Sequence, residues 1–336
     1  MSVTIKDVAK AANVSVATVS RVLNKQSNVS KEAFDKVTQV MEELGYSPNH
    51  LGRDLRKSET KRILAITASA EQSFYSEVLR GMEVAAAEQG YDVLIAATHD
   101  KPEHEMHLLN MLFSHSVDGA VLLGAKQEAE VISRLADNHN IALCLERMEG
   151  CSALTVTIDN AKAGRDAVSC LIGKGHRRIG LISTTTRSQS SVDREKGYRQ
   201  ALAEHGIEYD EKLVYLGNYD CGSGSEGCRR LLELEQPPTA IFSISDTIAI
   251  GAMKHAMSKG LAVGKDMMFI GFDNIAFSGI FVPRLSTVEQ PCFAQGNLVV
   301  KKLISNMKGE TADKGLYMLP HRLVLRESTG DSTADG

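Results

Sequence analysis

The sequence contains no long apolar run, no paired cysteines and no low-complexity tract beyond a small polar tail at 331–336. No apolar run approaches the roughly 18–20 residues that a membrane-spanning helix needs, so we expect no transmembrane segment. The N-terminus, MSVTIKDVAK, has no apolar stretch behind its charges and does not read as a signal peptide. We therefore expect a cytoplasmic protein.

Signatures of catalysis and of metal binding are also missing. The six cysteines are scattered singly, with no C-x-x-C pair and no histidine at zinc-finger spacing, and we expect small, reduced side chains. The sequence shows no nucleophile elbow, metal cluster or acid–base pair. It therefore predicts no catalytic residues, no metal and no cofactor.

One motif could suggest a dinucleotide site. The segment at 222–227 spells G-x-G-x-x-G, with Asp246 further along the chain. A dinucleotide fingerprint directly follows a strand, whereas five residues separate this motif from the apolar run that ends at Leu216. We therefore expect no NAD binding.

The composition is that of a globular protein with uneven charge. The chain has 336 residues, 43% hydrophobic and 24% charged, which fits two or three domains. Its net charge is −4, yet residues 1–62 hold eleven Lys and Arg against seven Asp and Glu, a local charge of +4. A basic N-terminal part on an acidic body indicates that only the N-terminal part meets a polyanion.

The first 45 residues are typical of three short helices. Thr4 can cap the first helix, with Asp7 three residues on to complete a capping box. Ser15 is a good N-cap for a second helix over Val16–Leu23, and a third is expected over Lys31–Leu44. Two short helices joined by a tight turn and braced by a third form a helix-turn-helix. Their predicted apolar faces are Val8, Ala9 and Ala12; Val19, Val22 and Leu23; and Phe34, Val37, Val40, Met41 and Leu44.

The chain then changes character twice. Residues 46–62 are too densely basic for a core and read as a linker, with helical potential between 49 and 57. From Arg62 on, short β-rich runs alternate with amphipathic helices, which favours an α/β fold with two successive doubly wound parallel sheets. The runs are Ile63–Thr67, Tyr91–Ala97, Gly119–Leu123, Ile141–Leu145, Leu154–Ile158, Ile179–Ser183, Leu213–Leu216, Ala240–Ile244 and Met267–Ile270.

These features together resemble one family. TIKDVAKAANVSVATVSRVLN and GYSPNHLGRDL are similar to the DNA-binding head of the lactose/galactose repressor family. The body carries similar strings in the family's order, among them VDGAVLL, TIDNAKAG, GHRRIGLI, REKGYRQAL, PPTAIFSISDTIAIGAM and FIGFDN. The resemblance covers residues 3 to about 328 and is strongest to the cytidine and purine repressor branch.

The resemblance implies how the head binds DNA. The second helix of a helix-turn-helix enters the major groove, which would place Val16, Ala17 and Arg21 toward the bases. Arg21 can donate two hydrogen bonds to guanine, whereas Thr18 and Ser20 suit phosphates. The expected DNA-binding residues are Thr4, Ser15, Val16, Ala17, Thr18, Ser20, Arg21, Asn24, Tyr46, Arg53 and Leu55.

The linker supplies a second predicted contact. In this family it forms a hinge helix that pries open the minor groove with a leucine, and the matching residue is Leu55. Gly52 stands where alanine is usual, and glycine costs a helix about 1 kcal/mol. We therefore expect a hinge that is less ordered away from DNA and tolerates altered operator spacing.

The body resembles a periplasmic sugar-binding protein with two lobes and crossovers near Asn160, Gln290 and Pro320. The expected domains are 1–47 for DNA binding, 48–61 for the hinge, and 62–330 for effector binding and dimerisation. Lobe 1 would comprise about 62–160 with 291–320, and lobe 2 about 161–290 with 321–330.

Ligand contacts should lie at strand ends, where open parallel sheets bind ligands. Phe74 and Tyr75 suit stacking on a ring, Arg194 is a fork donor for ligand oxygens, and Asp273 would accept from hydroxyls or an amine. Asp246 reads either as a contact or as a helix N-cap. The expected set is Phe74, Tyr75, Ser188, Ser190, Arg194, Tyr219, Asp246 and Asp273, with Arg187 beside Ser188 as an alternative for one family contact.

The sequence therefore predicts a homodimeric repressor that binds a pseudo-palindromic operator under control of a small molecule. We expect a nucleoside effector, with a sugar as the alternative. A cytoplasmic sugar- or nucleoside-binding protein is the second function class, and an enzyme built on the α/β body is the third.

Overall fold

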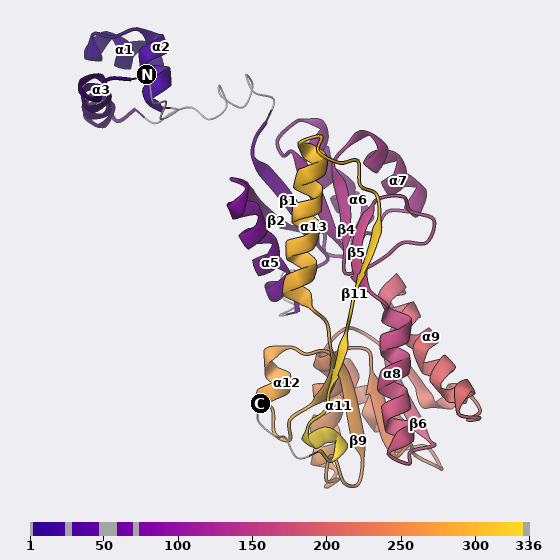
Figure 1. Cartoon of the computed structure of the whole chain (residues 1–336). Helices are drawn as coiled ribbons and strands as arrows, with labels where there is room; N and C mark the ends of the chain where they lie inside the picture. Colours follow the sequence, from indigo (N-terminus) through magenta and orange to yellow (C-terminus); the bar gives the residue numbers. More distant parts are fainter. Residues whose placement is uncertain (1–2, 24–28, 47–58, 70–73, 332–336) are drawn as a thin grey trace. The chain divides into compact units, whose positions relative to one another are not determined.

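The computed structural model describes residues 3–23, 29–46, 59–69 and 74–331. The chain divides into two compact units, Met1–Thr60 and Lys61–Gly336 (Figure 1). Among the described residues, no helix has both the length and the apolar character needed to cross a membrane. The boundaries predicted inside the linker fall mostly on residues 47–58, which lie outside the described ranges.

The first unit contains α1 (Ile5–Ala12), α2 (Val16–Leu23) and α3 (Lys31–Glu43). The bounds of α2 are those predicted, and α3 ends one residue earlier than predicted. The amide and the hydroxyl of Thr4 donate to Asp7 Oδ2 over 2.9 and 2.7 Å, so the predicted pairing of these two residues is present. Ser15 Oγ accepts from the Thr18 amide over 3.0 Å and caps α2. The buried side chains of this unit are Val8, Ala9, Ala12, Val19, Val22 and Val37.

The prediction of a buried side chain is wrong for two residues of the third helix. Phe34 and Leu44 are 39% and 38% exposed. Among the α3 side chains only Val37 is fully buried, where it packs with residues of α1 and α2, whereas Phe34 lies in the first turn and Leu44 just after the last residue of the helix. A periodic apolar stripe predicts which face is covered but not how far along the helix the cover extends.

The second unit holds two six-stranded sheets, as the alternation of strands and helices predicted. All strand pairs are parallel except that between β12 and β10. In spatial order the first sheet comprises β11 (Leu316–Leu319), β5 (Leu154–Ile158), β4 (Ile141–Cys144), β3 (Gly119–Leu123), β1 (Arg62–Thr67) and β2 (Asp92–Ala97). The second comprises β12 (Arg322–Val324), β10 (Ser286–Glu289), β9 (Met268–Asp273), β8 (Ala240–Ser243), β6 (Ile179–Thr184) and β7 (Val214–Gly217).

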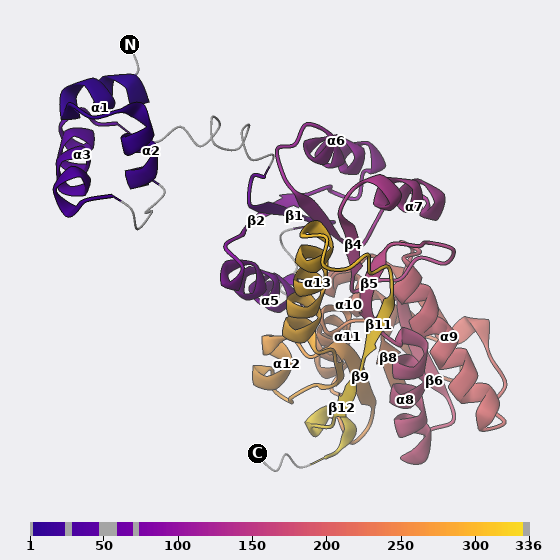
Figure 2. The same ribbon diagram turned by 45° about the horizontal axis from the view of Figure 1, so that its top comes forward.

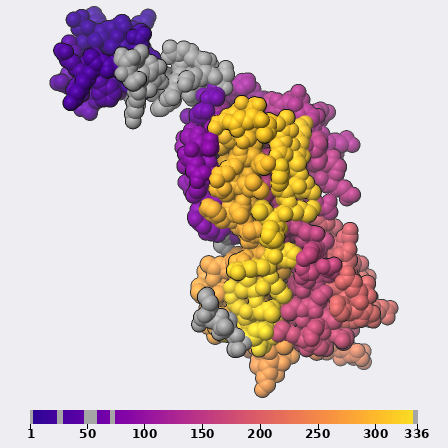
Figure 3. All heavy atoms as spheres, in the orientation of Figure 1, coloured from indigo at the N-terminus to yellow at the C-terminus, as the bar shows by residue number. Residues whose placement is uncertain are grey.

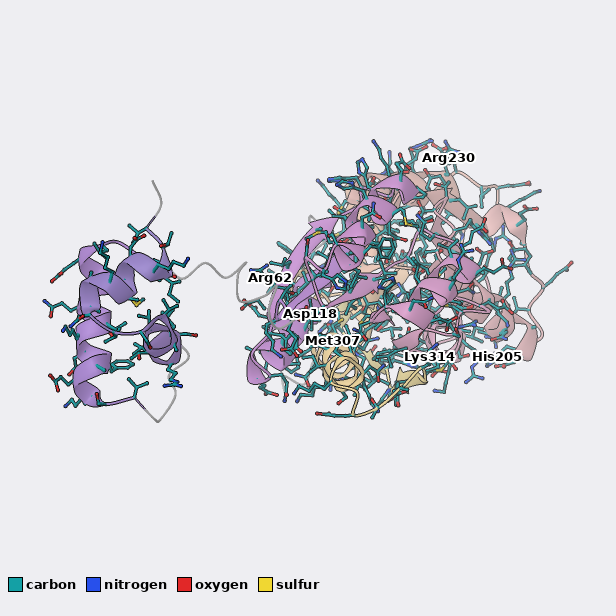
Figure 4. The ribbon with its side chains drawn as sticks, turned by 90° about the horizontal axis from the view of Figure 1, so that it is seen from above. Arg62, Asp118, His205, Arg230, Met307 and Lys314 are labelled. Atoms are coloured by element: carbon teal, nitrogen blue, oxygen red, sulfur yellow. The ribbon has the colours of Figure 1, made fainter. Side chains whose placement is uncertain are left out.

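Helices cover both faces of the first sheet, which with them forms lobe 1. Ile63 and Ala65 of β1 pack on one face with α5 and α13, and Leu64 and Ile66 pack on the other with α6 and α7. Arg62, where β1 begins, lies near Asp118 and Met307 at one end of this lobe (Figure 4). The helices of lobe 1 are α5 (Phe74–Glu88), α6 (Pro102–Phe113), α7 (Ala129–Asn138) and α13 (Cys292–Met307).

Lobe 2 is built in the same way around the second sheet, with α8 and α9 packed as one pair and α10 and α11 as another. The glycine-rich segment at 222–227 lies inside α10. A Cβ on Gly224 would come within 2.0 Å of the Ile248 carbonyl oxygen, so this glycine allows close contact between α10 and α11. The segments are α8 (Asn160–Gly173), α9 (Gln189–Glu204), α10 (Cys221–Leu232), α11 (Asp246–Ser258) and α12 (Ala276–Ile280), with 3-10 turns at Glu211–Leu213 and Glu327–Thr329.

The chain passes between the two sheets three times, from β5 into α8, from β10 into α13 and from β11 into β12 (Figures 1 and 2). These passages lie next to the crossover positions that the resemblance implied. In Figure 3 the C-terminal segment, in yellow, runs over one face of both lobes. Because only two residues separate β11 from β12, no helix reverses the chain and β12 joins its sheet antiparallel, a departure from the all-parallel expectation.

Candidate functional site

The outer face of α2 carries the residues expected to read DNA bases. Val16, Ala17 and Arg21 are exposed, while Val19 and Val22 are buried beneath them. The helix therefore presents one cation and two small apolar side chains to solvent on a rigid support. This is the surface that a major-groove reading helix requires.

The other predicted DNA contacts have more varied places. Thr4 and Ser15 are exposed, but both already act at helix ends, and the Ser15 and Thr18 hydroxyls lie 2.9 Å apart. Ser20 is half-buried, and Tyr46 packs against the core of the unit. Three further residues lie outside the described ranges: Asn24, Arg53 and Leu55.

A cavity of about 110 Å³ lies between the two lobes at the carboxyl ends of several strands. Its lining from lobe 1 includes Gly124 after β3 and Leu145 after β4, and its lining from lobe 2 includes Thr184 at the end of β6. This is the position that the strand-end rule predicts. Six predicted ligand residues line the cavity: Phe74, Tyr75, Ser188, Ser190, Arg194 and Tyr219.

Arg194 is the central cation of this cavity. Its Nε donates to Asn160 Oδ1 over 2.9 Å, and its Nη1 donates to the Ile244 carbonyl over 2.7 Å. Its guanidinium also lies 3.6 Å from the centre of the Phe272 ring. A buried arginine held by two hydrogen bonds and a ring is fixed in orientation, and Nη2 takes part in none of these contacts.

Asp273 lies beside Arg194, with 3.6 Å between Oδ1 and Nη1. Gln290 Nε2 donates to the same Oδ1 over 2.8 Å, and both side chains line a second cavity of about 510 Å³ that shares Phe74 with the first. Burial raises the pKa of Asp273 to about 6, although Arg194 and Gln290 act in the opposite direction. The predicted cation and carboxylate are therefore brought together in one site.

Several loops that line these cavities are conformationally strained. Asp100, Leu145 and Asp273 have φ values of 60°, 75° and 112°, all at or just after strand ends. Non-glycine residues in such conformations cost about 1–3 kcal/mol each and persist where the surrounding fold holds them. Strain of this kind is typical of ligand sites.

Two tyrosines supply hydroxyls without charge. Tyr75 donates to the Leu123 carbonyl over 3.4 Å, and Arg194 Nη1 lies 3.4 Å from the Tyr219 hydroxyl. Burial raises the pKa of both phenols above the usual value, so they stay protonated near neutral pH. They can both donate to and accept from a ligand.

The start of α9 joins the two lobes at the mouth of the cleft. The amide and hydroxyl of Ser190 donate to Glu146 Oε1 over 3.0 and 3.1 Å. Ser188 is the N-cap of α9 and accepts from the Ser191 amide over 3.3 Å. Arg187 instead pairs with Glu195 and lines a neighbouring surface cavity.

Asp246 lies apart from both cavities, contrary to the expected contact. It is fully buried and accepts from the Ser278 and Thr287 hydroxyls, each over 2.6 Å, and from the Ile275 amide over 2.9 Å. It is not the N-cap of α11 either, because Ser245 fills that place. Its carboxylate instead fixes the start of α12.

Several residues at the cleft were not predicted from the sequence: Asp100, Lys126, Glu146, Asn160 and Gln290. All follow predicted strands or sit at crossovers. Position after a strand was the usable signal, but many polar residues share it. Only the fold decides which of them face the cleft.

Comparison with known proteins agrees with this architecture. Residues 4–49 match the family model described as bacterial regulatory proteins, lacI family, and residues 168–329 match a periplasmic binding protein-like domain. Catabolite control protein A of Priestia megaterium is 35% identical over 98% of this chain and 100% of its own length. The chain belongs to the lacI family of bacterial regulatory proteins.

Two further regulators are similar to the chain over nearly its whole length. The transcriptional repressor CytR of Escherichia coli is 36% identical over 97% of this chain and 96% of that protein. A structure of the lac repressor dimer bound to operator and the anti-inducer ONPF has a TM-score of 0.88 at 27% identity, covering 98% of this chain and 99% of that one. This family member is therefore a transcriptional regulator with a DNA-binding unit and a two-lobed body.

Proposed function

We propose that this protein is a repressor whose affinity for a pseudo-palindromic operator is controlled by a small molecule bound between its two lobes. The observation that carries the proposal is the buried Arg194–Asp273 pair in an interlobe cavity, on a chain that also exposes the recognition face of α2. The N-terminal unit would bind DNA through α2, and the two-lobed body would bind the small molecule in its cavity. The relatives are regulators rather than enzymes, and we assign no reaction to the cleft.

On DNA, Arg21 would donate to guanine O6 and N7 in the major groove, and Val16 and Ala17 would contact thymine methyl groups. Thr18 and Ser20 would bind phosphates and set the register of the helix. Leu55 would enter the minor groove and kink the duplex. Further contacts are assigned to Thr4, Ser15, Asn24, Tyr46 and Arg53.

In the cleft, Phe74 and Tyr75 would stack on a ring, and their own rings lie 5.5 Å apart. Arg194 and Asp273 would bind its polar groups, with Ser188, Ser190 and Tyr219 around them. A nucleoside satisfies this set with its base and its ribose, and a sugar is the second candidate. The structure of the regulator CelR in complex with cellobiose is similar to this chain, with a TM-score of 0.74 and 29% identity, which supports a sugar as the second candidate.

A homodimer is supported by exposed apolar side chains on one side of the body. In lobe 1, Leu94 and Ile95 belong to the edge strand β2, and Val84 belongs to α5. In lobe 2, Ile280 and Val282 in and after α12 are 70% and 77% exposed. Figures 1 and 2 both show α5, β2 and α12 along the same side. A second copy of the chain would cover this surface.

Two experiments test the proposal. Gel shifts with promoter fragments, with and without nucleosides and sugars, should show a complex whose stability changes with one ligand. A chain that starts at Lys61 should stay folded and dimeric and should still bind the ligand, but it should lose operator binding. We expect the same result in the cytoplasm and in vitro. Operator binding by that shortened chain contradicts the proposal, and ligand binding without any DNA binding by the full chain favours the simple binding-protein alternative.

A further inference from the structure

We propose that the cleft selects unphosphorylated effectors, because its cations are already paired with carboxylates and it also presents acceptor oxygens that lack a cation or a hydrogen-bond donor. The inference rests on the proposed function and adds the charge of the ligand to it. It predicts a neutral, hydroxyl-rich ring compound and rejects nucleotides and sugar phosphates.

The positively charged side chains that line the cleft lie next to carboxylates. Lys126 Nζ lies 2.6 Å from Asp100 Oδ1 on the lobe 1 side of the cleft, and Arg194 lies against Asp273 on the other side. Arg147 and Arg187 at the mouth pair with Asp193 and Glu195, each over 3.1 Å. Every Lys and Arg that lines these cavities within the described residues therefore has a carboxylate partner. The segment 70–73 reads AEQS and adds no cation to the sequence there.

The hydrogen-bond acceptors of the cleft also favour a neutral ligand that carries hydroxyl or N–H groups. Glu146 lines the cleft and accepts only from Ser190 among the hydrogen bonds of the described residues, with no cation paired to it there. Gln290 Oε1 is buried and has no partner in the described part of the chain. An unmet buried acceptor is costly, and a ligand hydroxyl or N–H removes that cost.

A phosphomonoester is the wrong complement for these groups. It carries about −1.5 to −2 charges at neutral pH and brings only acceptor oxygens. A phosphate bound to Lys126 or to Nη2 of Arg194 would also lie close to Asp100 or Asp273, the carboxylate paired with that cation, and would face it as a like charge. A sugar or ribose ring instead brings hydroxyl donors to Glu146, Asp273 and Gln290.

The test uses the full-length chain and matched ligand pairs. Calorimetry at pH 7.5 would compare adenosine, cytidine, ribose and glucose with their monophosphates. We expect at least one neutral compound to bind and its monophosphate to bind 100-fold or more weakly. A monophosphate that binds as tightly as its parent, or a panel with no neutral ligand, overturns the inference.

A gain-of-binding variant separates charge selection from loss of folding. Asp100→Asn leaves Lys126 without its partner, and we expect the affinity ratio of monophosphate to parent to rise about 10-fold. Glu146→Gln should move the ratio in the same direction, whereas Glu208→Gln, an exposed change that lines neither cavity, should leave it unchanged. An unchanged ratio in both cleft variants contradicts the charge rule.

Operator binding measured on the same samples keeps the two proposals apart. If a monophosphate binds and changes operator affinity, the repressor proposal stands and only the charge rule fails. If a neutral ligand binds selectively without changing operator affinity, the charge rule stands and control by the effector fails.

Discussion

Arg194 on α9 and Asp273 at the end of β9 face each other at 3.6 Å, and both side chains are almost completely buried. The pair closes one wall of the ligand cavity, so it serves the stability of lobe 2 and the chemistry of the site together. Removing one partner of a buried ion pair leaves an uncompensated charge, which is more damaging than losing the attraction.

Asp273→Ala should therefore lower the free energy of unfolding by about 3–5 kcal/mol and weaken the effector by about 10-fold or more. Urea unfolding would measure the first effect, and calorimetry with whichever compound of the panel described above binds the wild-type chain would measure the second. Glu208→Ala, an exposed change in the same lobe, is the control. Unchanged ligand affinity in the Asp273 variant removes this residue from the site.

Arg21→Ala should cost about 1–3 kcal/mol on the specific operator and little on random DNA, because a bidentate base contact carries discrimination. Fluorescence anisotropy with both DNAs at one salt concentration measures the difference. Lys10→Ala, an exposed cation on α1, controls for the loss of charge. Equal losses on both DNAs would mean that Arg21 touches only phosphate.

We expect the titration of Asp246 to contribute to the pH dependence of the free energy of unfolding. Burial raises the pKa of this carboxyl to about 7, with Asp273 as a further raising charge. A raised pKa means that the folded state binds this proton more tightly than the unfolded state does. The stabilisation of the folded state by protonated Asp246 is therefore complete below about pH 4 and is lost as pH rises to about 7.

Asp246→Asn removes this titration. Relative to the wild type, the variant should gain stability as pH rises from about 4 to 7, as measured by urea unfolding at steps across that range. The comparison between the two chains cancels the opposite trend from His176 and His255, whose pKa values burial lowers. A constant difference across the range contradicts the assignment.

Gly224→Ala should destabilise the protein by about 1–3 kcal/mol, the usual cost of overpacking, because the new Cβ meets the Ile248 carbonyl at 2.0 Å. Gly173→Ala in α8 is the matched control, since nothing lies within 4 Å of its Cβ. Thermal unfolding compares the two. If Gly224→Ala is as stable as the control, close helix packing does not explain the motif.

Much of the fold followed from the pattern of the sequence. The strands predicted at Ile63–Thr67 and Leu154–Ile158 are present because long runs of buried β-branched and aliphatic residues have few other solutions. The strands at Ser286–Glu289, Leu316–Leu319 and Arg322–Val324 escaped prediction. They are three or four residues long, and the side chains of Leu316 and Met318 are exposed.

The site was predicted less evenly. Arg194 and Asp273 carry the resemblance in REKGYRQAL and GFDN, and the fold brings them together. Asp246 has the same kind of position after a strand, yet its carboxylate turns toward Thr287 and Ser278. Which way a strand-end side chain turns depends on the neighbouring strand and loop, and no local pattern encodes that neighbour.

The two sheets share their last strands with the very end of the chain. β11 completes the first sheet and β12 the second, and α13 covers a sheet whose other strands were made much earlier. During synthesis, therefore, neither lobe can be finished until residues 316–324 have left the ribosome. A chain cut short before that point would expose β5 and β10 as unpaired edges at once, so loss of the last strands would disturb both walls of the effector cleft together.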